Sequence, residues 1–155
     1  MAGNGTGTRP LIPLLSRLYG PLIPLAWPLI RLATGLFLVP HGAQKLFGWF
    51  GGRGLNGTSA AFAKMGFEPA WLTAPLVGGI EFFGGLLIAA GFLTRPTAFA
   101  AAIVLGVAVT VHLPNGFFAN KGGYEYAMLW AVLCAAIAVR GGGRLSIDRA
   151  IGREF

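Results

Sequence analysis

The sequence has little charge. Asp, Glu, Lys and Arg together make up 11% of its 155 residues, whereas 55% of the residues are apolar. Soluble domains carry about 25% charged residues, so this composition excludes an ordinary soluble domain and predicts a membrane protein. A few spanning helices would use most of a chain of this length, which leaves no room for a second, soluble catalytic domain.

Cysteine is also scarce. Cys134 is the only cysteine and it lies in an apolar run, which excludes an intramolecular disulfide, a CxxC redox pair and a Cys-rich metal site. We therefore expect no metal centre. Any redox chemistry must come from a bound cofactor, a quinone or a partner.

Runs of basic residues are missing as well. The net charge is +7, but Lys and Arg stand singly at the ends of apolar runs, without interleaved aromatic residues, and this excludes a nucleic-acid-binding protein. Most of them fall on the side of the two termini, at Arg9, Arg17, Arg95, Arg140, Arg144, Arg149 and Arg153. The opposite loops hold Arg53, Lys64 and Lys121, with Lys45 near that surface. The positive-inside rule then predicts a multi-pass protein of the cell (inner) membrane with both termini in the cytoplasm.

The N-terminal residues lack the pattern of a spanning helix. Residues 1–8 are rich in Gly, Thr and Asn, which favours disorder, and no apolar core with a small-residue cleavage site follows, so we expect no cleaved signal. Between residues 11 and 27, Pro13, Pro21 and Pro24 stand too close together for a regular span. We interpret residues 1–27 as a disordered and interfacial segment.

Four long apolar runs follow. They predict membrane spans at about residues 28–47, 71–93, 97–113 and 124–139. The turn at residues 94–96 is too short for anything but an antiparallel return. The sequence therefore predicts an all-α fold, a four-helix transmembrane bundle over residues 28–140. The basic cytoplasmic tail is residues 141–155, where Ser146 or Asp148 could cap a short helix.

The few charges inside these runs indicate where a site would lie. An ionisable group near the bilayer centre costs at least about 2.5–3.5 kcal/mol, so it normally finds a partner. Arg31, His41 and Lys45 lie along one stripe of the first predicted span, and Glu81 is the only charge in the second. We expect Glu81 to neutralise these basic groups. Alternatively, Arg31 and Lys45 simply extend to the two membrane surfaces.

A polar centre in the outer half of the bundle follows from these positions. We expect it to contain Arg31, Lys45, His112 and Glu125 beside the two candidate proton-transfer groups, His41 and Glu81. Oxidation of a quinol releases protons as well as electrons, so a quinone site needs such a base next to aromatic walls. The candidate walls are Trp49, Phe82 and Phe83.

Other interpretations of the same residues stay open. The charges could form an ion-pair network that only holds four helices in register. His41 and His112 could ligate one haem. The glycine and alanine faces of the helices also suit an accessory subunit of a larger complex, and a transporter of a small polar molecule is a further alternative.

Several sequence segments resemble the DoxX family of small membrane proteins. They are HGAQKLFGWFGG (residues 41–52), EFFGGLLIAAGFLTRP (residues 81–96), GFF and GGYEYA (residues 116–118 and 122–127), and GGGRLSID (residues 141–148). The resemblance implies a four-helix membrane bundle, and it implies association with quinone-linked sulfur oxidation or redox-stress assemblies. We therefore favour a membrane component of a quinone-linked redox system. Its expected partners are the lipid bilayer and other membrane or redox subunits, or further copies of the chain, and the sequence leaves open whether it catalyses a reaction.

Overall fold

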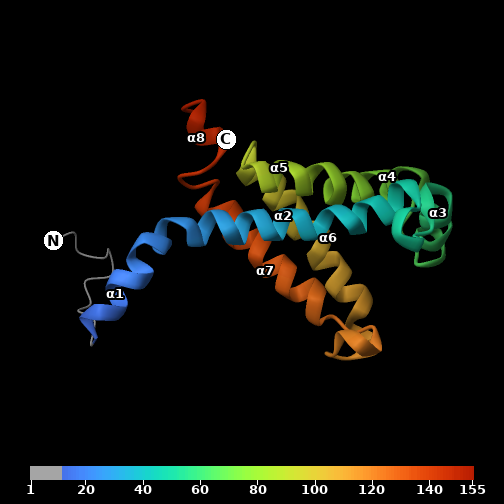
Figure 1. Ribbon diagram of the computed structural model, residues 1–155. Coiled ribbons are helices and arrows are strands. Elements are labelled where there is room, and N and C mark those ends of the chain that lie inside the picture. The colour runs from blue at the N-terminus through green and yellow to red at the C-terminus, as the bar shows by residue number, and fades with distance from the viewer. Residues whose placement is uncertain (1–11) are drawn as a thin grey trace.

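The computed structural model describes residues 12–155, and within this range the chain forms helices and turns without a β-strand (Figure 1). The predicted all-α class is confirmed. The predicted disorder of residues 1–8 lies outside the described residues.

The N-terminal segment is helical for most of its described length. A short helix, α1 (Pro13–Tyr19), leads through a 3-10 turn, η1 (Gly20–Leu22), into the long helix α2 (Ile23–Phe47). Pro24 does not interrupt α2, because it stands in the first turn, where a missing N–H costs nothing. The helix therefore begins five residues before the predicted residue 28. Figure 1 shows α1 turned away from the axis of α2.

The second apolar run is one helical rod with an irregular centre. After the short helix α3 (Gly54–Lys64), the rod consists of α4 (Ala70–Gly79), a π-helical turn η3 (Ile80–Gly84) and α5 (Gly85–Ala90). The rod ends before the predicted residue 93, because Gly91 adopts a left-handed conformation (φ +72°) that terminates it. Glu81 lies within the π turn, a feature that is frequent at functional sites.

The C-terminal half contributes the helical hairpin of α6 (Thr94–His112) and α7 (Glu125–Arg140), followed by the short helix α8 (Ile147–Ala150). Short 3-10 turns lie in the loops of the chain. They are η2 (Trp49–Gly51), η4 (Leu113–Asn115) and η5 (Ala119–Lys121).

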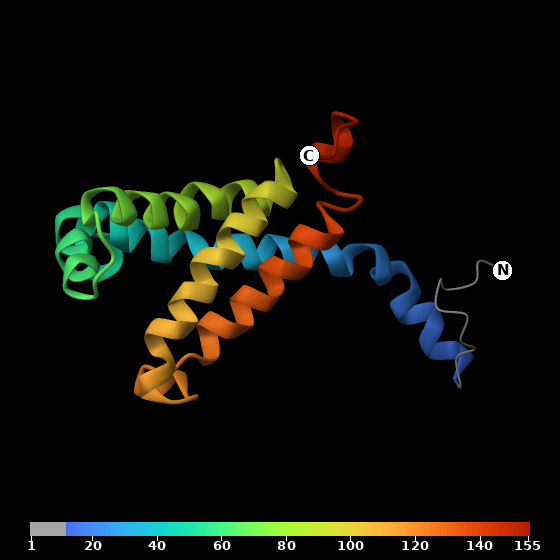
Figure 2. The same cartoon turned by 180° about the vertical axis from the view of Figure 1, so that it is seen from behind.

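The helices form two antiparallel pairs. α2 packs along α4, η3 and α5, while α6 and α7 pack mainly on each other. Figures 1 and 2, seen from opposite sides, both show the second pair crossing α2 obliquely. Gly35 and Gly42 of α2 allow the first pair to approach closely, since a Cβ atom at either position would collide with the backbone of Gly85 or Phe82.

Within residues 12–155, three helical stretches are long and apolar enough to cross a membrane. They are Arg17–Phe47, Ala70–Ala90 and Thr94–Asn115. α7 has 16 residues, fewer than the roughly 20 that a spanning helix needs. The fourth span therefore stays a prediction, as do the complete four-helix bundle and the side on which the termini lie.

One region of the fold, which we call the tail end, joins segments that are far apart in the sequence. It comprises residues 23–31 of α2, residues 91–95 at the junction of α5 and α6, and residues 140–154. The indole nitrogen of Trp27 donates to the carbonyl of Gly141 at 3.0 Å. The amide of Asp148 donates to the carbonyl of Gly91 at 2.9 Å. The C-terminal tail is thus fastened to the helices rather than trailing from them.

Candidate functional site

The central feature of the site is an ion pair between the first two apolar helices. Lys45 Nζ lies 2.5 Å from Glu81 Oε2, and Glu81 is only 7% exposed. The predicted neutralisation of Glu81 by a basic group of the first span is confirmed, with Lys45 as the partner. A lone carboxylate at this position would carry a large desolvation cost, so the pair makes a buried charge tolerable.

The carboxylate belongs to the irregular centre of the second helical rod. A π turn inserts one extra residue into a helix and rotates the side chains that follow it. Glu81 is buried while Phe83, two residues later in the same turn, is 56% exposed. Glu81 and Phe83 therefore face opposite sides of the turn, the carboxylate toward Lys45 of α2 and the ring outward.

A cavity of about 330 Å³ adjoins Lys45 of this pair, whereas Glu81 is not part of its lining. It lies between the end of α2, the loop after it and α3, and Lys45 forms part of its wall. The other lining residues are Gln44, Gly51, Gly52, Arg53, Thr58, Ala61, Phe62 and Met65. The hydroxyl of Thr58 donates to the carbonyl of Lys45 at 3.1 Å, which ties α3 to α2 across the cavity.

The predicted aromatic walls form a cluster, but none of them lines this cavity. The rings of Phe47 and Phe82 are 5.1 Å apart, those of Phe47 and Trp49 5.0 Å, and those of Phe82 and Phe83 5.0 Å. Trp49 and Phe83 are more than half exposed. The large apolar groups of the cavity are Phe62 and Met65 instead. The sequence analysis named neither residue.

Arg31 is not part of this site. It is 3% exposed, and its guanidinium donates to the carbonyls of Ile88 and Leu145 at 3.0 and 2.6 Å. Fourteen residues separate it from Lys45, which is about 21 Å along a helix. Arg31 and Lys45 both face the second helical rod, whereas His41 of the predicted stripe is exposed, and the length of α2 places Arg31 at the tail end.

The remaining predicted residues are dispersed. His41 is exposed on α2. His112 Nδ1 lies 2.8 Å from the carbonyl oxygen of Gly122, and Glu125 accepts from the amide of Ala119 at 3.0 Å. His112 and Glu125 thus organise the loop between α6 and α7. The single polar centre predicted from the sequence is therefore wrong as a cluster, and haem ligation stays a prediction that a Soret band in the purified protein would test.

A second polar cluster, which the sequence analysis missed, surrounds Asp148. This carboxylate is 2% exposed and accepts from the amides of Leu93 and Thr94 at 2.9 and 3.0 Å, and from the Thr94 hydroxyl at 2.6 Å. Asp148 therefore caps the start of α6, while Ser146 caps α8 by accepting from the amide of Arg149 at 3.2 Å. The available signal was the pair of acidic residues, Asp148 and Glu154, among the arginines of the tail.

Comparisons with known proteins support the membrane class of this chain. The model of the DoxX family matches residues 26–113. The inner membrane protein YqjF of Escherichia coli (strain K12) is 34% identical over 109 residues, which are 70% of this chain and 82% of that protein. A protein of Haemophilus influenzae described as uncharacterized is 27% identical over 88 residues, or 56% of this chain. The matched region spans 58% of that relative's length. No solved structure matches.

Proposed function

Because this chain belongs to the DoxX family of multi-pass membrane proteins, we propose that it is the membrane component of a quinone-linked redox system. The Lys45–Glu81 pair is its contact with the quinone head group. The observation that carries this proposal is the Lys45 ammonium, which lines a cavity of about 330 Å³ and is paired with the buried carboxylate of Glu81. Small-ligand sites typically enclose about 300–1,000 Å³ with a few placed polar groups.

The chemistry of the pair suits a quinone. Reduction of a quinone takes up two electrons and two protons, and oxidation of the quinol releases them. The Lys45 ammonium donates a hydrogen bond to the ring oxygen, stabilises negative charge on it and transfers the proton, and Glu81 exchanges that proton through Lys45. The electrons pass to or from a redox centre of a partner subunit. His41 lies one helical turn before Lys45 and is exposed, so it is the candidate for passing protons onward.

The orientation of the site follows from the distribution of charge. The tail end carries Arg95, Arg140, Arg144, Arg149 and Arg153, and the positive-inside rule assigns it to the cytoplasm. The cavity beside Lys45 then opens in the outer half of the membrane. The name of the Escherichia coli relative supports the inner membrane as the location.

Titration of the purified full chain in nanodiscs with a short-chain ubiquinone analogue tests the proposal. Trp49 lies against Phe47, next to Lys45, so its fluorescence should be quenched as quinone binds. We expect Glu81→Gln and Lys45→Met each to weaken binding about tenfold or more, the value of a charged hydrogen bond. Glu154→Gln is the matched control at the tail end. Quenching that is equally strong in all four proteins would refute the site.

An accessory subunit without a quinone site is the alternative function. An apolar groove of about 480 Å³ between α4, η3 and α6 favours it, since a helix of a partner subunit would fit there. Glu81→Gln separates the two functions. Loss of electron transfer in native membranes with normal insertion and assembly supports the quinone site, whereas loss of the protein or of its complex supports the accessory function.

A further inference from the structure

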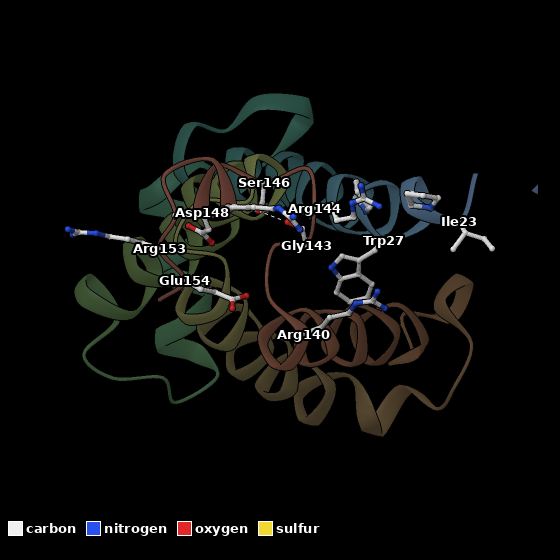
Figure 3. A pocket seen from close by; sticks show the side chains of 13 residues that line it. Ile23, Trp27, Arg140, Gly143, Arg144, Ser146, Asp148, Arg153 and Glu154 are labelled. Atoms are coloured by element: carbon white, nitrogen blue, oxygen red, sulfur yellow. Dashed lines mark hydrogen bonds between the residues drawn. The ribbon is translucent and has the colours of Figure 1, made fainter. Parts of the chain in front are cut away.

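A large cavity at the tail end is unrelated to the Lys45–Glu81 pair. It encloses about 590 Å³ between the start of α2, the end of α7 and the tail (Figure 3). Its lining combines residues of opposite character. Ile23, Pro24, Trp27 and Pro28 of α2 form an apolar side, and four arginines and two acidic residues line the rest. The arginines are Arg140, Arg144, Arg149 and Arg153, and the acidic residues are Asp148 and Glu154.

Both acidic residues already accept from other groups. The Asp148 carboxylate accepts hydrogen bonds from Leu93 and Thr94, and Glu154 Oε1 lies 3.3 Å from Arg95 Nη2. Within residues 12–155, the structure gives no ion pair to Arg144 or Arg149. The cavity therefore presents an excess of positive charge.

The side chains that line this cavity point in different directions. In Figure 3 the Arg153 side chain points away from the cavity, while Trp27 and Arg140 lie along one side of it. The Arg140 guanidinium stands 4.4 Å from the centre of the Trp27 ring, a cation–π contact that holds both side chains in place. Three arginines then remain to receive an anion, namely Arg140, Arg144 and Arg149.

The position of the cavity relative to the membrane surface indicates the class of ligand. Tryptophan is enriched where the hydrocarbon meets the head groups, and Trp27 lies between the apolar residues of α2 and the arginines of the tail. An occupant must therefore have an anionic group next to an aliphatic part. Basic pockets at the ends of transmembrane helices bind anionic lipid head groups for this reason.

We propose that the tail-end cavity binds the phosphate group of an anionic phospholipid. Arg140, Arg144 and Arg149 hold the phosphate oxygens, and Ile23, Pro24 and Pro28 contact the upper part of the acyl chains. Arginine suits this task because its planar fork donates two hydrogen bonds to one phosphate. The inference depends on the fold of the tail and is independent of the quinone proposal.

Native mass spectrometry of the full chain tests the lipid site. The protein is released from nanodiscs that contain phosphatidylglycerol and phosphatidylcholine in equal amounts, and the retained lipids are counted. We expect preferential retention of phosphatidylglycerol, and Arg144→Gln combined with Arg149→Gln should weaken it about 10- to 30-fold. The control Lys64→Gln with Lys121→Gln removes two exposed charges elsewhere and should leave retention unchanged.

Two further measurements distinguish lipid binding from misfolding and from binding of a free anion. Arg144→Lys with Arg149→Lys keeps the charge, so partial retention there supports binding of the phosphate and excludes misfolding as the cause of loss. Inorganic phosphate added at millimolar concentration is the probe for a free anion. The proposal is overturned if inorganic phosphate displaces the lipid completely, if both lipids are retained equally, or if the control pair loses as much lipid as the arginine pair.

Discussion

At the scale of single residues, the buried ion pair has the largest electrostatic consequence. Lys45 is the only partner that the structure gives Glu81 within residues 12–155. Removing the ammonium leaves a carboxylate in a low-dielectric environment, and this is costly, whereas removing both charges is close to neutral. The pair is therefore tolerated rather than strongly stabilising, which is consistent with a functional reason for keeping it.

We expect Lys45→Met to destabilise the protein by about 3 kcal/mol. The double variant Lys45→Met, Glu81→Leu should recover most of this loss, because no unpaired charge remains. Thermal unfolding in detergent measures both. Additive losses in the double variant would show that the two side chains do not interact.

Asp148 is the second residue for which the structure predicts a strong effect. Asp148→Asn replaces a carboxylate that accepts three hydrogen bonds, and the loss should be about 1.5–3 kcal/mol. Glu154→Gln removes an exposed ion pair, which is worth at most about 1 kcal/mol. Unfolding measured by circular dichroism compares the two. Equal effects would contradict the assignment of Asp148 as the cap of α6.

At the scale of elements, close contact between α2 and the rod α4–η3–α5 depends on glycine. A Cβ atom at Gly35 would collide with backbone atoms of Gly85 and Ala89, whereas one at Gly106 of α6 would meet nothing within 4 Å. The two positions therefore give a matched comparison of the same substitution in two helices.

We expect Gly35→Ala to separate the two helices and to lower the unfolding temperature. Gly106→Ala should raise stability by about 0.5–1 kcal/mol, because alanine restricts the unfolded chain and favours the helix. The unfolding temperatures of the two variants and of the unchanged protein are compared in detergent. A higher unfolding temperature for Gly35→Ala would contradict this packing.

At the scale of the whole molecule, the topology follows from whether α7 crosses the membrane. If all four helical segments span, the loops at residues 48–69 and 113–124 lie on the side opposite the tail. In intact cells a membrane-impermeant maleimide should then label Asn56→Cys and Lys121→Cys but not Arg153→Cys, each in a Cys134→Ala background. Labelling of Asn56→Cys without Lys121→Cys would mean that the α6–α7 pair does not span as predicted.

The sequence predicted the parts of this molecule that depend on local pattern. A lone acidic residue in an apolar run requires a partner, so the pairing of Glu81 with the first span could be inferred from composition and helical geometry. The partner of Arg31 could not be inferred in this way, because the Leu145 carbonyl belongs to a tail that folds back only in the tertiary structure. The role of Asp148, the π turn at Glu81 and the oblique crossing of the two helix pairs are tertiary for the same reason.

The most direct test of the quinone site is to map where a quinone lies. Irradiation of the protein in nanodiscs with a photoreactive azidoquinone, followed by peptide mass spectrometry, locates the contact. The account predicts crosslinks within residues 44–65 and at Glu81 or its neighbours, suppressed by excess natural quinone and by Glu81→Gln. Crosslinks confined to the α6–α7 pair or the tail, or crosslinks that natural quinone does not suppress, would contradict it.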